Sequence, residues 1–289
     1  MRRNPHRPFD PDLLSTFVEG RTISSARLLS GGRRNSNYAV TLHDGLKCVV
    51  RLYAQGGPGK EIGALELARA VVPVQQVLAT GDDWAVLSWL EGRPLSEVPD
   101  ATASAAEAIA CISTIRLESS GWITPSKDVH PFSFAGGLGF IRQKLSSPQV
   151  AAHLGPSSLQ RVTHIVRRSE ARLKVMDAQS CLVHGDFNPS NVLVGGGTVS
   201  GIVDWEFSHS GSPWLDIGNL LRHTDSPRHR DIEAGLRTGG FDLPDDWTTW
   251  ARLADLSAHL EFLDSDSPED QVKRSLRWLG RFLRQAGGE

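Results

Sequence analysis

The hydrophobic periodicity of the sequence changes near residue 90, and this change constrains the fold more than any other feature. Before it, short runs rich in β-branched and aromatic residues predict strands over residues 38–43, 46–53, 76–80 and 84–90. The dipeptide Asp44-Gly45 separates the first two runs and is a strong hairpin signal. One helix is expected within this group, over about residues 59–70. The N-terminal part therefore predicts a small antiparallel sheet.

After residues 91–94 the pattern becomes mostly helical. Asp100 is a candidate N-cap for a helix whose buried face would contain Ala105, Ala108, Ile109, Ile112 and Ile115. Ser157 begins a capping-box pattern ahead of a second helix, and Ser267-Pro268 introduces the last one. A chain of 289 residues has room for about two domains. We therefore predict an α+β chain of two lobes, residues 1–90 and residues 91–289.

The charge balance indicates a small partner. The 31 Lys and Arg residues against 33 Asp and Glu residues give a formal net charge of −2, and no run of like charges occurs. Nucleic acid and anionic membrane surfaces are recognised through basic patches, so neither is expected as a partner.

The cysteines and the N-terminus indicate a reducing compartment. Cys48, Cys111 and Cys181 are odd in number and far apart, without the spacing of a disulfide framework or a zinc site. Residues 4–8 are polar and proline-rich where a signal peptide would need an apolar core, and no run approaches 18 apolar residues. A cytoplasmic location without a membrane span is the expectation.

One polar segment has the composition of a reaction site. His184-Gly185-Asp186-Phe187-Asn188-Pro189-Ser190-Asn191 lies between two short apolar runs, and Pro189 keeps it out of helix. Asp204 follows thirteen residues after Asn191, at the end of a β-type run. Two oxygen ligands, Asn191 and Asp204, together with a further carboxylate, Asp186, are what magnesium-dependent phosphoryl transfer requires.

The pattern H-G-D-x-x-x-x-N followed by I-V-D-W-E resembles the signature of the aminoglycoside phosphotransferase and choline kinase family. Gly211, Pro213 and Asp216 resemble its usual continuation, so the likeness spans residues 182–221. The resemblance implies a bilobal protein-kinase-like fold, with an N-terminal sheet lobe that binds nucleotide and a helical lobe that binds substrate. It also implies ATP or another nucleoside triphosphate, Mg²⁺, and a small-molecule hydroxyl as acceptor.

The resemblance also implies roles for individual residues. Asp186 would orient the acceptor hydroxyl and take its proton, and Asn191 and Asp204 would hold Mg²⁺. His184 would be structural, and the Asp216 carboxylate would hold the loop backbone near His184. The alternative is that Asp186 and Asn191 only form a turn. Their spacing from His184 and Asp204 favours a functional role.

The N-terminal half contains the counterparts that such a fold needs for nucleotide binding. The glycine-containing loop over residues 31–38, with Asn35 and Ser36, lies between β-type runs where a phosphate-covering loop is expected. Arg51 occupies the strand position where protein kinases carry a phosphate-binding Lys. We predict Glu61, on the buried face of the following helix, as its partner, in preference to Glu66.

Residues 85–92 resemble the segment that joins the two lobes. The backbone carbonyl of Ser88 and the backbone N–H of Leu90 would contact the adenine edge of the nucleotide. Alternatively, Arg51 is a surface strand residue and Glu61 an ordinary acid of a first helical turn.

Three other motifs were considered, and none of them indicates a functional site. Gly59-Lys60 lacks the remaining residues of a P-loop, Gly195-Gly196-Gly197 indicates a hairpin turn, and no nucleophile elbow occurs. Two C-terminal groups are expected to be solvated: the acids Asp264, Asp266, Glu269 and Asp270, and the stripe Arg277, Arg281 and Arg284.

The sequence therefore predicts a kinase that transfers the γ-phosphoryl group of ATP to a small-molecule hydroxyl, with aminoglycosides or related antibiotics as candidate acceptors. The principal alternative is a metabolite kinase acting on choline, homoserine, a sugar or a similar alcohol. A nucleotide-binding pseudokinase and a metal-dependent phosphoesterase are more remote alternatives.

Overall fold

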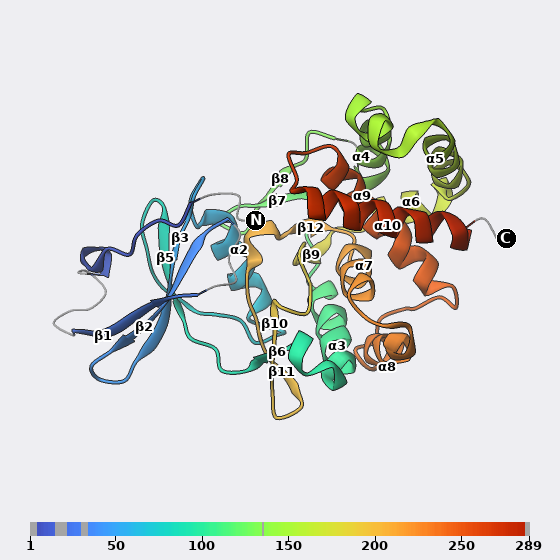
Figure 1. The fold of residues 1–289 in the computed structure, drawn as a ribbon. Helices are drawn as coiled ribbons and strands as arrows, with labels where there is room; N and C mark the ends of the chain where they lie inside the picture. The colour runs from blue at the N-terminus through green and yellow to red at the C-terminus, as the bar shows by residue number, and fades with distance from the viewer. Residues whose placement is uncertain (1–4, 15–21, 30–33, 135, 287–289) are drawn as a thin grey trace.

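The computed structural model describes residues 5–14, 22–29, 34–134 and 136–286 of the protein. A twisted antiparallel sheet forms one end of the molecule, and helices form the larger remainder (Figure 1). The predicted two-lobed α+β architecture is therefore confirmed.

The N-terminal sheet contains five antiparallel strands in the order β1-β2-β3-β5-β4. Their bounds are β1 (Ile23–Leu28), β2 (Ser36–Leu42), β3 (Lys47–Leu52), β4 (Val77–Thr80) and β5 (Trp84–Ser88). The β2–β3 hairpin turns at Asp44-Gly45 as predicted, and Gly45 has a φ of +89°, a conformation that favours glycine. The four predicted strands differ from β2, β3, β4 and β5 only at their ends, whereas β1 was not predicted.

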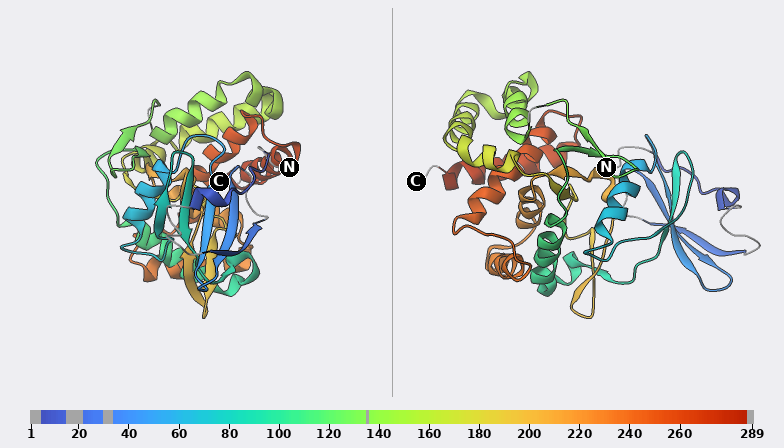
Figure 2. Two further views of the ribbon diagram at one scale, coloured as in Figure 1. Left: turned by 90° about the vertical axis from the view of Figure 1, so that its left-hand side faces the viewer. Right: turned by 180° about the vertical axis from the view of Figure 1, so that it is seen from behind.

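Helix α2 (Gly59–Ala68) lies between the sheet and the helical part in the views of Figures 1 and 2. Its buried residues include Glu61, Ala64, Leu65 and Ala68, the helical face predicted from the sequence. Val49 and Leu87 of the sheet belong to the same core cluster as these alanines and Leu65, so α2 shares the main core of the molecule.

The helical part is built from eight helices within the described residues. These are α3 (Thr102–Ser113), α4 (Gly136–Leu145), α5 (Pro148–Arg168), α6 (Glu170–Asp177), α7 (Trp214–Arg222), α8 (His229–Thr238), α9 (Trp247–Leu263) and α10 (Glu269–Ala286). Short 3-10 turns also occur along the protein, at η1 (Pro11–Leu14), η2 (Leu95–Glu97), η3 (Pro99–Ala101), η4 (Trp205–Phe207) and η5 (Ser226–Arg228). Helix α3 packs on α8, and α7 packs on α9, which also contacts α10.

One predicted helix start is wrong. Asp100 does not cap α3, because it lies in η3 and its carboxylate pairs with Arg228 at 2.7 Å. The span of α5 starts at Pro148 with Ser147 as its N-cap, but it joins two helical segments. They are separated by a break at Gly155, whose φ of 69° and ψ of 164° are not helical, so Ser157 lies near the start of the second segment.

Two small sheets lie on either side of the loop over residues 184–191, since β9 precedes this loop and β10 follows it. One has the order β11-β10-β6, from β6 (Arg93–Pro94), β10 (Val192–Gly195) and β11 (Thr198–Ile202). The other has the order β8-β7-β12-β9, from β7 (Gly121–Ile123), β8 (Val129–Pro131), β9 (Cys181–Val183) and β12 (His209–Gly211). The β10–β11 hairpin turns at residues 195–197, as predicted.

The three cysteines are free thiols, and burial raises the pKa of Cys48 to about 11. Within the described part of the protein, no helix combines the length and the apolar composition needed to cross a bilayer.

Candidate active site

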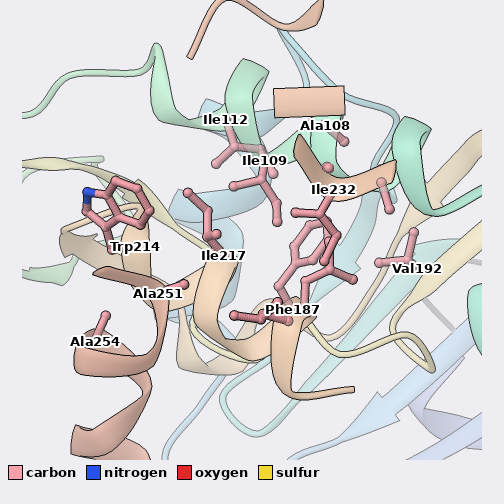
Figure 3. Close-up of a cluster of buried hydrophobic side chains, with 14 of the residues drawn as sticks. Ala108, Ile109, Ile112, Phe187, Val192, Trp214, Ile217, Ile232, Ala251 and Ala254 are labelled. Carbon is pink, nitrogen blue, oxygen red and sulfur yellow. The ribbon is translucent and has the colours of Figure 1, made fainter. Parts of the chain in front are cut away.

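The loop over residues 184–191 connects β9 to β10 and is anchored to the helical core by Phe187. This side chain is fully buried and lies among Ile109, Ile217 and Ile232 (Figure 3). Its neighbour Asp186 stays half-buried. The apolar anchor therefore holds the loop on the core and leaves the adjacent carboxylate accessible.

Gly185 and Asp216 shape the start of this loop. Gly185 has a φ of +80°, and a Cβ added there would lie 2.3 Å from the Phe207 carbonyl oxygen, so only glycine fits. The two carboxylate oxygens of Asp216, on α7, accept hydrogen bonds from the backbone N–H of His184 (2.7 Å) and of Gly185 (2.9 Å). The loop-holding contact that the resemblance implied for Asp216 is present.

We expect an Asp216→Ala substitution to lower the free energy of unfolding by about 3 kcal/mol, because it leaves one buried and one partly buried N–H donor without acceptors. Burial raises the pKa of Asp216 to about 6, above its ordinary value. A carboxyl with a raised folded-state pKa stabilises the fold at low pH and loses that contribution as pH rises through about 6. The destabilisation by Asp216→Ala should therefore be larger at pH 4 than at pH 7.

Urea titrations at both pH values measure this effect. Glu97→Ala is a matched control, because Glu97 is exposed and its one ion pair among the described residues is with the exposed Arg93. An unfolding midpoint of Asp216→Ala equal to that of the wild type would contradict the assigned role.

Hydrogen bonds join Asp186 to Asn191 and tie the loop to the segment that carries Asp204. Asn191 Nδ2 donates to the backbone oxygen of Asp186 (3.0 Å) and to its Oδ2 (3.2 Å). His184 Nδ1 accepts from the N–H of Asp186 (3.2 Å), so its Nε2 is the atom that donates to the Val203 carbonyl (3.0 Å). Val203 directly precedes Asp204, so His184 ties the loop to the segment that carries the second acid.

Asp204 has a left-handed backbone conformation, and its carboxylate pairs with the buried Arg51. Its φ of 69° and ψ of 58° are left-handed, which is rare outside glycine and is often found at functional sites. Its carboxylate accepts a hydrogen bond from Arg51 Nη2. Burial acts to raise the pKa of Asp204, but the charge and hydrogen bond of Arg51 outweigh it and hold that pKa below its ordinary value.

Arg51 is buried, with 3% of its surface exposed, and it forms the predicted pair with Glu61 at 2.7 Å. The pair forms because alternate residues of a strand share a face: Arg51 lies on the side of β3 that faces α2. Tyr53 on the same side donates its hydroxyl to the other oxygen of Glu61. Burial acts to lower the pKa of Arg51, but Asp204 and Glu61 raise it, so the guanidinium stays charged.

Glu206 is a site residue that sequence reasoning missed. Its Oε1 lies 3.8 Å from Arg51 Nη2, and its Oε2 accepts from Asn35 Nδ2 at 3.0 Å. Burial, and then the charge of Asp204, raise the pKa of Glu206. In the sequence, the only signal that Glu206 belongs to the site was its position two residues after Asp204. Three carboxylates therefore surround one guanidinium, which leaves the site with excess negative charge.

The other residues predicted to bind the nucleotide lie in the N-terminal lobe. Asn35 is buried and bridges Glu206 to the N–H of Ala54 (3.2 Å), and Ser36 Oγ accepts from the N–H of Arg7 (2.9 Å). The Ser88 carbonyl accepts from Gln75 Nε2 (3.0 Å), which uses one of its two acceptor positions. Leu90 lies just beyond β5. The glycines of the predicted loop, at 31 and 32, and Arg33 lie outside the described residues.

A family model described as the phosphotransferase enzyme family matches residues 25–256. Acyl-CoA dehydrogenase family member 11 from Rattus norvegicus is 26% identical over 149 residues, which are 48% of this protein. The match covers 18% of the rat protein, so it corresponds to a small part of that relative.

Two solved structures have the same fold. The ternary complex of a thermostable mutant of aminoglycoside phosphotransferase APH(4)-Ia with AMP-PNP and hygromycin B aligns with a TM-score of 0.70 and 17% identity, over 96% of this protein and 100% of that one. Macrolide 2'-phosphotransferase MphH from Brachybacterium faecium aligns with a TM-score of 0.65 and 18% identity, over 93% and 96%. Both likenesses establish the bilobal kinase-like fold.

Proposed function

The protein belongs to the phosphotransferase enzyme family, and we propose that it transfers the γ-phosphoryl group of ATP, with Mg²⁺, to a hydroxyl group of a small molecule. The observation that carries this proposal is a connected set of polar residues. Asp186 is hydrogen bonded to Asn191, the backbone oxygen of Asn191 accepts from the N–H of Val203 beside Asp204, and Asp204 contacts the buried Arg51–Glu61 pair. In this view residues 1–90 bind the nucleotide, and residues 91–289 carry the catalytic groups and the acceptor site.

The donor set fits a magnesium ion. The described residues contain no cluster of three or more His, Cys, Asp and Glu ligands, but Mg²⁺ at kinase sites takes one or two carboxylates together with phosphate oxygens. Asp204 would supply a carboxylate, and Asn191, whose Nδ2 is engaged by Asp186, would supply its Oδ1. The excess negative charge around Arg51 favours a divalent cation there. When bound, Mg²⁺ neutralises charge on the β- and γ-phosphates.

Asp186 is the group that handles the acceptor proton. The acceptor oxygen forms a bond to the γ-phosphorus, the bond to the ADP oxygen breaks, and the hydroxyl proton passes to the Asp186 carboxylate. Asn191 Nδ2, at 3.2 Å from Oδ2, orients this carboxylate. The anchored backbone on either side restricts its movement, which keeps the acceptor in the reactive geometry.

Arg51 would contact the nucleotide phosphates, held in place by Glu61. The polar residues Asn35 and Ser36 lie at the end of the phosphate-covering loop, and the backbone at Ser88 and Leu90 would contact the base. A guanidinium can bind two phosphate oxygens at once, so Arg51→Lys should recover only part of the activity of the wild type.

We expect Arg51→Ala and Glu61→Ala each to lower kcat/KM about tenfold or more, and the double variant to lose less than the product of the two. The reason is that each residue acts through the other. A double-mutant cycle on kcat/KM measures the coupling, with Glu66→Ala as control, since Glu66 is on the same helix but pairs with the exposed Arg69. Strictly independent effects, or an active Arg51→Ala enzyme, would show that another cation serves the phosphates.

The acceptor class separates the candidate functions. Purified protein with ATP and Mg²⁺ should be tested against aminoglycosides, macrolides, choline, homoserine and simple sugars, with product masses recorded. A phosphorylated antibiotic would indicate resistance, and a phosphorylated metabolite would indicate a metabolic kinase of the cytoplasm. Phosphoester hydrolysis without ATP, or ATP binding without turnover on any acceptor, would refute the kinase proposal.

A further inference from the structure

A second arginine lies beside the proposed reaction site, although the proposed function does not use it. The guanidinium carbon of Arg34 lies over the Phe207 ring, 5.2 Å from its centroid. Asn35, the next residue, donates from Nδ2 to Glu206 Oε2 at 3.0 Å. Two consecutive residues of the N-terminal lobe therefore contact two consecutive residues of η4, the turn that directly follows Asp204.

Phe207 packs against the loop that carries Asp186. A Cβ placed on Gly185 would lie 2.3 Å from the carbonyl oxygen of Phe207 and 3.2 Å from its Cβ. Gly185 directly precedes Asp186, so Arg34 lies on the side of the site that holds the proposed proton acceptor. The acceptor hydroxyl must lie between that carboxylate and the γ-phosphorus, so the γ-phosphoryl group is the part of the nucleotide expected nearest to Asp186. Arg34 is therefore placed on the γ-phosphoryl side of the site.

The charge of Arg34 acts on the acids of the site. Burial acts to raise the pKa of Asp204 and that of Glu206, and the charges of two arginines act to lower both. These arginines are Arg51 and Arg34. Among the described residues, Arg34 forms no ion pair with an acid and donates no hydrogen bond. Its charge therefore reaches the acidic site without being neutralised by a carboxylate of its own.

Stacking on Phe207 holds the Arg34 guanidinium and leaves its N–H groups available. A guanidinium stacks through its flat face, whereas its N–H donors lie at its edge. Arg51 differs, because its Nη1 donates to Glu61 and its Nη2 to Asp204. A triphosphate would add negative charge to a site that already holds three carboxylates around Arg51. A second guanidinium with available donors is therefore suited to bind phosphate oxygens.

We propose that Arg34 is a second phosphate-binding cation of this protein and contacts the γ-phosphoryl group of the nucleotide. This inference rests on the proposed function and adds a catalytic residue to that reaction. The acceptor oxygen bonds to the γ-phosphorus, the bond to the ADP oxygen breaks, and the hydroxyl proton passes to Asp186. Arg34 forms no covalent bond in this step, and its N–H groups stabilise the negative charge on the γ-phosphoryl oxygens during transfer.

The γ-phosphate contact can be measured without turnover. AMP-PNP and ADP are titrated separately into the 289-residue protein by calorimetry, with Mg²⁺ present. We expect Arg34→Gln to weaken AMP-PNP binding about tenfold and to leave the Kd for ADP within about twofold, because ADP lacks the group that Arg34 contacts. Arg34→Lys should retain part of the AMP-PNP affinity. Arg27→Gln is the matched control, since Arg27 is an exposed arginine of β1 in the same lobe.

The comparison of the two nucleotides separates a phosphate contact from a structural role. Equal weakening of AMP-PNP and ADP binding by Arg34→Gln, or no weakening of either, would overturn the inference and leave the kinase proposal standing. A selective loss of AMP-PNP binding, in a protein that phosphorylates no acceptor, would support the contact and refute the kinase proposal. A wild-type protein that binds neither nucleotide would refute both.

Single-turnover kinetics test whether the contact acts during transfer. With an acceptor identified by product mass, we expect Arg34→Gln to lower the transfer rate by about 10²-fold or more and to leave the KM for the acceptor within about twofold. Phe207→Leu should cause a smaller loss of rate, because it removes the ring on which the guanidinium stacks. Adding Phe207→Leu to Arg34→Gln should lower the rate little further, since both act on one contact. A wild-type transfer rate in Arg34→Gln would overturn the catalytic role.

Discussion

Replacing Asp186 with Asn should lower kcat by about 10²- to 10⁴-fold while leaving the Kd for ATP within about twofold of the wild type. In the proposed function the carboxylate acts on the acceptor hydroxyl and not on the nucleotide, so its loss would remove proton transfer but no phosphate contact. The amide retains the shape of the carboxylate and can still accept a hydrogen bond from Asn191 Nδ2, now 3.2 Å from Asp186 Oδ2. The fold of the loop should therefore survive.

Single-turnover kinetics and calorimetry with ATP measure the two quantities separately. Asp128→Asn is a suitable control, because Asp128 is exposed and is hydrogen bonded to Ser126 and Thr124, its neighbours in the same turn. If ATP affinity collapsed in Asp186→Asn while turnover per bound nucleotide stayed normal, Asp186 would belong to the nucleotide site instead.

The second large effect is expected at Asp204. An Asp204→Ala substitution should weaken Mg²⁺-dependent ATP binding by about 100-fold or more, because it removes the carboxylate proposed to bridge the metal to the phosphates. Asn191→Ala should show a smaller loss, since an amide oxygen carries no net charge. Asp204→Ala also removes the carboxylate that contacts Arg51 Nη2, so the Arg51 guanidinium would remain without this partner to attract the phosphates.

Nucleotide titrations with and without Mg²⁺ check this prediction. Because Arg51 holds the pKa of Asp204 below its ordinary value, the carboxylate stays ionised as the pH falls through about 5. Magnesium-dependent binding by the wild type should therefore persist at pH 5. An Asp204→Ala protein with the magnesium dependence of the wild type would disprove the metal assignment.

The loop proposed to be catalytic was predictable from the sequence because its polar residues are close together in the chain. Asp186 and Asn191 lie five residues apart, and Asp204 follows after one hairpin, so residue type and spacing alone define the group. The Arg51–Glu61 pair was also predictable, because strand alternation and helical periodicity each determine which face a residue occupies. The change of hydrophobic periodicity near residue 90 predicted the two lobes, because strands and helices place apolar residues at different sequence intervals.

Other features depended on contacts between residues far apart in the sequence. Asp100 resembles an N-cap locally, but its carboxylate pairs with Arg228, and Glu206 enters the site through Arg51 and Asn35. Arg281 belongs to the predicted exposed stripe, and only the packing of α10 against α7 and α9 places it in a cavity with Arg222 and Arg252.

Two arginine-lined cavities of the helical lobe therefore depend on the tertiary structure alone. Their arginines come from α5, α6, α7, α9 and α10, and no sequence interval relates them. Local periodicity determines which face of a helix is apolar, but which polar residues meet at the helix ends depends on how the helices cross. The residues of the proposed phosphoryl-transfer chemistry could thus be found from the sequence, whereas the polar residues that meet between the helices could be found only from their packing.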